Sequence, residues 1–121
     1  NERAVKLTEK NGIIAFCTYI LALPGENYED SLKTIKFSLK VKSTMAMFYL
    51  PVPYPGTELI NIARDYGGLR EGAVWEDYSA VDFSNMVYVN PLIGKEKMLA
   101  LLKLAYRKYY TNPIVIMKKL L

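Results

Sequence analysis

Two apolar runs, each closed by a Pro-Gly turn, dominate the pattern of hydrophobic and polar positions along the chain. The first run stops at a Leu-Pro-Gly-Glu turn (residues 23–26), and the second stops at a proline-rich segment (residues 51–58). Successive apolar positions are typical of a parallel strand that is covered on both faces. The pattern therefore predicts buried strands over residues 13–22 and 44–50, each feeding a helix.

The segments after the two strands have helical periodicity. Asn27 is placed to cap the first helix, and Thr57 is placed to cap the second, which should end at the Gly67-Gly68 pair. The apolar positions recur at spacings of three and four residues, which is one face of an α-helix. These positions are Tyr28, Leu32, Ile35 and Leu39 in the first helix, and Leu59, Ile62, Ala63 and Tyr66 in the second.

The remaining segments are mostly helical, with one irregular stretch. Residues 1–10 resemble the tail of a helix, and residues 69–93 hold no single period, although 88–90 could form a short strand. An amphipathic helix is predicted over 95–110, and Asn112-Pro113 opens a last helix, 114–121. The apolar face of the long helix comprises Met98, Leu101, Leu102, Ala105, Tyr106 and Tyr109.

This pattern predicts the α/β class, with two parallel strands, flanking helices and a helical C-terminal extension. We place the β/α units in residues 1–68, and the irregular segment with the extension in residues 69–121. Consecutive β/α units belong to parallel sheets, in which ligands bind at the carboxyl ends of the strands. Both Pro-Gly turns should therefore lie on the functional edge.

Composition narrows the chemistry. The 121 residues, 51% of them apolar, support one small domain or a piece of a larger one. The chain has no histidine and one cysteine, so it offers no internal disulfide, no Cys-only metal site and no catalytic triad. We assign no catalytic residue and no metal ligand, and expect Cys17 to be a buried, inert thiol. No membrane span or signal peptide is visible, which favours the cytoplasm.

The net charge is +4, with lysines concentrated toward the C-terminus. The simplest interpretation is solvated helix faces; the alternative is a surface for RNA. At the turns, Glu26 and Glu58 could serve acid–base chemistry, but first-turn acids that satisfy helix amides are the favoured interpretation. Exposed backbone amides and carbonyls beside an apolar wall would also suit a planar heterocycle.

At these turns the chain resembles the C-terminal half of a radical S-adenosylmethionine (SAM) domain. The resemblance rests on Tyr19–Asp30 (YILALPGENYED) with Thr34-Ile35, and on Pro53–Leu59 (PYPGTEL). The ending, Leu104–Tyr110 (LAYRKYY) followed by Asn112-Pro113, is similar to the subgroup that carries a cobalamin-binding domain. That subgroup includes proteins described as anaerobic magnesium-protoporphyrin IX monomethyl ester oxidative cyclases.

The resemblance implies the last two strands of a partial (β/α)6 TIM-like barrel, in a parent enzyme that uses SAM and a [4Fe–4S] cluster, with cobalamin as an option. The chain lacks the three cysteines that hold such a cluster. It would then be a fragment that contributes part of the SAM adenine pocket. The implied adenine contacts are Ile20, Ala22, Leu23, Pro24, Gly25, Leu50, Pro51 and Val52, with Tyr54 toward the substrate.

On this hypothesis the isolated chain is inactive, and its partners are the rest of the parent barrel and a small-molecule substrate. Unpaired strand edges should make the fragment self-associate. Two alternatives stay open: an RNA-binding or tRNA-modification module that uses the basic C-terminal helices, and a purely structural assembly domain.

Overall fold

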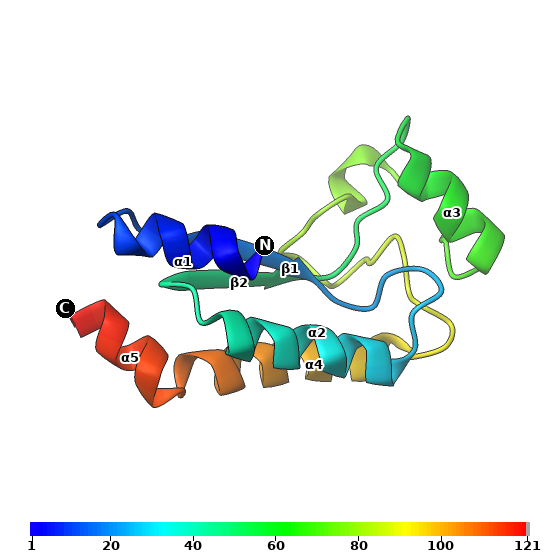
Figure 1. Cartoon of the computed structure of the whole chain (residues 1–121). Helices are drawn as coiled ribbons and strands as arrows, with labels where there is room; N and C mark the ends of the chain where they lie inside the picture. The colour runs from blue at the N-terminus through cyan, green and yellow to red at the C-terminus, as the bar shows by residue number, and fades with distance from the viewer. Residues whose placement is uncertain (121) are drawn as a thin grey trace.

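A computed structural model describes residues 1–120 and has an α/β architecture with two parallel strands (Figure 1). Two helices, α2 and α4, lie side by side beneath the strands, and α3 stands apart from them. The predicted final helix position, Leu121, lies outside the described residues. The elements are α1 (Glu2–Lys10), β1 (Phe16–Ile20), α2 (Tyr28–Val41), β2 (Met45–Tyr49), α3 (Glu58–Tyr66), the 3-10 turn η1 (Trp75–Asp77), α4 (Lys95–Tyr110) and α5 (Pro113–Leu120).

The strands β1 and β2 form a two-stranded parallel sheet whose register runs from Phe16 opposite Met45 to Ile20 opposite Tyr49. Because α2 carries the chain back between them, both strands point the same way and their carboxyl ends lie together. This confirms the parallel pair. The strands are shorter than predicted, since Ile13 and Ile14 belong to an exposed loop before β1.

The starts of α2 and α5 follow the sequence signals, whereas Thr57 stands at the N-cap of α3 without a side-chain capping hydrogen bond. The Asn27 side chain accepts a hydrogen bond from the Asp30 amide at 3.1 Å, and the Asp30 carboxylate accepts one from the Asn27 amide at 3.1 Å. This reciprocal capping box fixes the start of α2 directly after the first turn. At the other end of the chain, the Asn112 side chain accepts from the Ile114 amide at 3.0 Å and begins α5.

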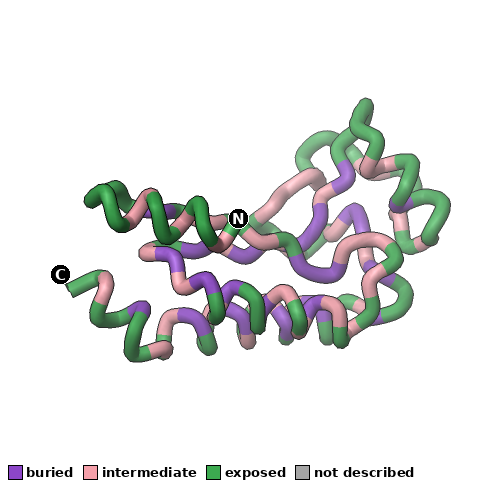
Figure 2. Tube along the Cα trace, viewed as in Figure 1, coloured by how far each residue is buried: buried purple, intermediate pink, exposed green. Residues whose placement is uncertain are grey.

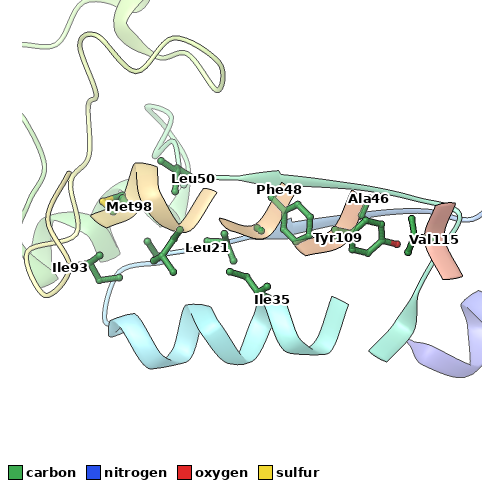
Figure 3. Packing of buried hydrophobic residues seen from close by; sticks show 12 residues of the cluster. Leu21, Ile35, Ala46, Phe48, Leu50, Ile93, Met98, Tyr109 and Val115 are labelled. Atoms are coloured by element: carbon green, nitrogen blue, oxygen red, sulfur yellow. The ribbon is translucent and has the colours of Figure 1, made fainter. Parts of the chain in front are cut away.

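One hydrophobic core joins the strands to α2, α4 and α5 (Figure 3). Residues on both sides of the expected 68/69 boundary contribute to it. The predicted apolar face of α4 is confirmed, because Met98, Leu101, Ala105 and Tyr109 are all buried. The members of the cluster are Leu21, Ala22, Ile35, Ala46, Phe48, Leu50, Ile93, Met98, Leu101, Ala105, Tyr109 and Val115.

The expectation that both faces of the strands are covered is wrong for residues 1–120. Helices α2 and α4 pack on one face only, and Phe16, Ile20 and Met45 on the other face are exposed. Cys17 is consequently half-buried rather than buried. Figure 2 shows the same division, with the buried positions gathered between the strands and the helix layer.

The expected inward face of α3 is also only partly present. Ala63 is buried, but Ile62 and Tyr66 are exposed because α3 projects away from the helix layer. The short strand expected at 88–90 is reduced to a single antiparallel bridge between Leu69 and Tyr88. None of the helices within residues 1–120 is both long and apolar enough to cross a membrane.

Tyrosine hydroxyl groups close the outer edge of β2. The Tyr106 hydroxyl donates to the Phe48 carbonyl and accepts from the Phe48 amide, both at 3.1 Å. The Tyr110 hydroxyl donates to the Ala46 carbonyl at 2.6 Å and accepts from the Ala46 amide at 3.3 Å. A phenol can both donate and accept, so each tyrosine replaces the two hydrogen bonds that a neighbouring strand would supply.

Replacing either of these tyrosines with phenylalanine should remove the hydrogen bonds that its hydroxyl group makes to β2. We expect Tyr106→Phe or Tyr110→Phe to lower the free energy of unfolding by about 1–2 kcal/mol, because strand amides and carbonyls lose their partners. Amide exchange should accelerate at Phe48 or Ala46 respectively. Tyr66→Phe, at an exposed tyrosine of α3, is the control. Unchanged exchange at both strand positions would contradict this role.

The other edge of the sheet, along β1, is open within residues 1–120. The Met45 amide donates to the Ala15 carbonyl and the Leu21 amide donates to the Tyr49 carbonyl, so the odd-numbered positions face β2. Hydrogen bonding alternates along a parallel strand, and the main-chain groups of Phe16, Thr18 and Ile20 therefore face away from β2. Such an edge is a template for pairing with another strand.

We expect the isolated chain to associate through this edge at high concentration. Thr18→Pro removes an outward-facing N–H group without touching the bonds to β2, so it should reduce association. Thr18→Val, which keeps the amide, should associate as the parent does. Sedimentation velocity over a concentration series measures both. Equal association of the two variants would show that β1 is not the contact.

Candidate functional site

The turn after β1 is tightly organised by its own side chains. Ala22 has a positive φ of 61°, a conformation that costs a residue with a Cβ about 1–2 kcal/mol. Its amide donates to the buried Ser31 hydroxyl at 2.9 Å, and the Leu23 amide donates to the Glu26 carboxylate at 3.1 Å. Glu26 therefore has a structural partner, although that amide belongs to the turn rather than to α2.

A buried asparagine from a distant segment completes the turn. The Asn90 side chain is fully buried, and its Nδ2 group donates to the carbonyl oxygens of Leu23 at 2.8 Å and Glu26 at 2.9 Å, with the Ala22 carbonyl at 3.4 Å. Its Oδ1 atom accepts from the Leu92 amide at 2.9 Å. The Asn90 carboxamide thus connects the turn after β1 to the segment that precedes α4.

The backbone at Gly68 positions the segment that contains Asn90. The Val89 amide donates to the Gly68 carbonyl at 3.0 Å, and the Arg70 amide donates to the Val87 carbonyl at 2.8 Å. Gly68 has a φ of +90°, and a Cβ there would lie 1.9 Å from the Val89 carbonyl oxygen. Only glycine permits this close approach, which aligns the segment that carries Asn90 beside the end of α3.

The end of β2 lies beneath the irregular segment. Leu50 and Pro51 are buried, Val52 is half-buried, and a small cavity separates them from residues of the 77–88 segment. Tyr88 lines this cavity, and its hydroxyl group is buried without a hydrogen-bond partner among the described residues. Burial raises the pKa of Tyr88 to about 12, so the phenol is neutral at physiological pH.

The structure brings the sequence-predicted site residues to one edge but divides them by exposure. Ile20 is 45% exposed, and Gly25 is exposed beside the ring of Tyr66. Ala22, Leu50 and Pro51 are buried, and can shape the site without offering surface. The half-buried members are Leu23, Pro24 and Val52. Tyr54 is exposed, with its ring stacked on Tyr78 at a centroid separation of 5.9 Å.

One expected feature of the turn needs correction. The sequence suggested that its backbone groups face a ligand, but the amides of Ala22 and Leu23 are bonded to Ser31 and Glu26. Recognition by the first turn would therefore rest on apolar packing. Within residues 1–120, no group of three or more histidine, cysteine, aspartate or glutamate side chains could hold a metal ion.

Sequence reasoning missed Asn90, the residue that organises the site. An Asn-Pro dipeptide is typical of a turn, but residues 88–90 were considered only as a possible short strand, and nothing in the pattern indicates a buried carboxamide there. Ser31 was missed similarly, because a serine inside a helix has no distinctive pattern. Both act through partners that are distant in the sequence.

We expect Asn90→Ala to lower the free energy of unfolding by about 2–4 kcal/mol, because it leaves the turn carbonyls and the Leu92 amide without partners. Asn90→Asp should be worse at neutral pH, since a carboxylate would face carbonyl oxygens. That environment raises its pKa in the folded state, so the variant should be more stable at acidic pH and lose stability as the pH rises.

Chemical denaturation of both variants at several pH values measures this dependence. Asn61→Asp, at an exposed position of α3, is the matched control and should remain close to the parent. A small, pH-independent loss for Asn90→Asp would contradict the role of the Nδ2 donor.

Comparison with known proteins shows what the chain is similar to. No family model matches the chain. The chain is 33% identical over 115 residues to an uncharacterized methyltransferase of the archaeon Pyrococcus horikoshii, a match that covers 95% of this chain. It spans about a quarter (24%) of the length of that relative.

This finding corrects the sequence-based assignment. The matched protein is described as a methyltransferase, so the assignment to a radical SAM iron–sulfur enzyme of the cobalamin-binding subgroup is wrong. The ring-cyclase function falls with it, and the comparison lends no support to a [4Fe–4S] cluster or cobalamin. The RNA-binding and assembly alternatives gain no support either. The resemblance rested on short turns, and Pro and Gly are common in turns for conformational reasons that do not specify a reaction.

Proposed function

We propose that this chain forms part of a methyltransferase and contributes one wall of its binding site for the methyl donor SAM. The observation that carries the proposal is the position of two Pro-Gly turns at adjacent carboxyl ends of parallel strands. Ligands bind at that edge of parallel sheets. The similarity to a methyltransferase supplies the reaction class.

In this proposal the adenine ring of SAM packs on the accessible part of the edge. Ile20 offers an exposed aliphatic surface, and Leu23, Pro24, Gly25 and Val52 continue it. Ala22, Leu50 and Pro51 form the buried layer that holds this surface in place. An aliphatic wall beside a tight turn suits the flat face of a purine. Tyr54, exposed on the loop after β2, faces the methyl acceptor.

The remainder of the protein completes the site. The open edge of β1 and the exposed face of the sheet fit a larger parallel sheet, such as a partial (β/α) barrel, that continues beyond β1. Residues 1–68 supply its last β/α units, and residues 69–121 supply the extension that closes β2. Methyl transfer needs the missing walls and the acceptor site, so the chain alone is inactive. A cytoplasmic location remains our prediction.

Titration of the ¹⁵N-labelled chain with SAM tests the proposal. We expect weak, saturable binding, roughly millimolar because most of the site is absent, with shifts at the amides of Ile20, Gly25 and Val52. Ile20→Arg should weaken binding at least about ten-fold by removing the aliphatic surface. The matched control is Phe37→Arg, at an exposed apolar residue of α2.

Methionine, which lacks the nucleoside, serves as the ligand control and should shift none of these amides. Shifts that methionine reproduces, or equal binding by the Ile20→Arg variant and the parent, would refute the adenine wall.

A further inference from the structure

We propose that a second site, an aromatic cluster next to the strand ends, binds an organic onium cation, that is, an alkylated ammonium or sulfonium group. The aromatic cluster consists of Tyr54, Trp75 and Tyr78. None of the three residues belongs to the adenine wall, but Tyr54 is also the residue that the proposed function places toward the methyl acceptor, so the two proposals share that side chain.

The three rings come from two separate segments and meet as one group. Tyr54 follows β2, while Trp75 and Tyr78 belong to η1 and the residue after it. The ring centroids are 5.9 Å apart for Tyr54 and Tyr78, 6.0 Å for Trp75 and Tyr78, and 6.4 Å for Tyr54 and Trp75. The three rings therefore form one cluster, with Tyr54 and Tyr78 stacked and Trp75 tilted toward both.

The cluster remains open to solvent. Trp75 is 70% exposed and Tyr54 is 38% exposed, while the core lies elsewhere, among the strands, α2 and α4. Because these aromatic side chains lie outside the core and are exposed, their burial contributes little to the stability of the fold. Exposed aromatic groups of this kind are typical of binding surfaces.

The charge around the cluster selects a cation. Residues 54–86 contain six acidic and two basic residues, although the whole chain has a net charge of +4. Glu76, Asp77 and Asp82 line a polar cavity together with Ser79 and Asn85, and Glu76 and Asp77 belong to the same turn as Trp75. These carboxylates therefore belong to the same segment as Trp75 and Tyr78, where their negative charge attracts a cation.

The carboxylates of Asp77 and Asp82 have lowered pKa values and are ionised at neutral pH. The Arg70 guanidinium, 2.6 Å from the Asp77 carboxylate, holds the pKa of Asp77 below its ordinary value. Hydrogen bonds from Ser84 lower the pKa of Asp82. Arg70 offsets the charge of Asp77, which leaves Glu76 and Asp82 as the carboxylates that act on a bound cation.

An onium group matches both features at once. Its positive charge is attracted by the negative faces of aromatic rings, and its methyl groups pack on those faces without requiring hydrogen bonds. A neutral planar ligand would stack equally well but would gain nothing from the carboxylates. A hydrated metal ion would use the carboxylates but not the rings.

Trp75 is the only tryptophan in the chain, so its fluorescence and its indole N–H resonance report directly on the site. We would titrate the full chain with tetramethylammonium and, separately, with trimethylsulfonium, at constant ionic strength set with sodium chloride. Saturable changes with either cation are expected, and the tighter of the two identifies the ammonium or the sulfonium class. Neutral tert-butanol, of similar shape, should bind at least about five-fold more weakly.

Two variants retain the tryptophan reporter. Tyr54→Ala and Glu76→Gln should each weaken cation binding by about three-fold or more, because one removes a ring and the other a charge. Tyr66→Ala, at an exposed tyrosine outside the cluster, should bind as the parent does. The proposal is overturned if neither cation gives a saturable response, if tert-butanol matches them, or if Tyr54→Ala binds unchanged.

Discussion

The arrangement of this protein depends on a single buried carboxamide. Asn90 reaches from the start of the α4 region to the turn after β1, where its Nδ2 group serves the carbonyls of Leu23 and Glu26. A buried donor or acceptor without a partner is costly, so this residue and the turn must keep one relative position. The parallel pairing of β1 and β2 brings their carboxyl ends to one edge, and the segment that carries Asn90 also covers the end of β2.

The two edges of the sheet differ in whether their main-chain groups are hydrogen-bonded. On one side, Tyr106 and Tyr110 occupy the hydrogen-bonding groups of β2, so the sheet ends there. On the other side, β1 presents free main-chain groups beside exposed Phe16 and Ile20 within residues 1–120. This difference supports our proposal that the sheet continues past β1 in a larger protein. The relative that the chain matches is about four times as long.

Much of this fold follows from local sequence signals. The apolar runs gave both strands, and spacings of three and four residues gave the helices that pack on them. Asn27 and Asn112 capped where expected because a cap is a local interaction. The exposure of Ile62 and Tyr66 could not be predicted, since it depends on whether α3 finds a surface to cover. Which face of a helix is buried depends on the element that packs against it, and the apolar residues of the helix do not specify that element.

The candidate site was predictable only in position. The turns were expected at the carboxyl ends of two parallel strands and lie there, but the segment 77–88 that covers the end of β2 has no sequence period. Likewise, the backbone groups of the first turn were expected to bind a ligand, but they form hydrogen bonds with the side chains of Ser31, Glu26 and Asn90. The resemblance to a radical SAM domain relied on these same short turns, and short turns specify a local geometry better than they specify a reaction.

Hydrogen exchange of the side-chain carboxamides measured by NMR tests the role of Asn90 most directly. If its Nδ2 protons are shared between the carbonyls of Leu23 and Glu26 in a fully buried position, they should exchange on the order of a hundred-fold more slowly than those of exposed Asn61. Exchange of Asn90 at the rate of Asn61 would mean that the carboxamide does not hold the turn, and the shared edge would lose its foundation.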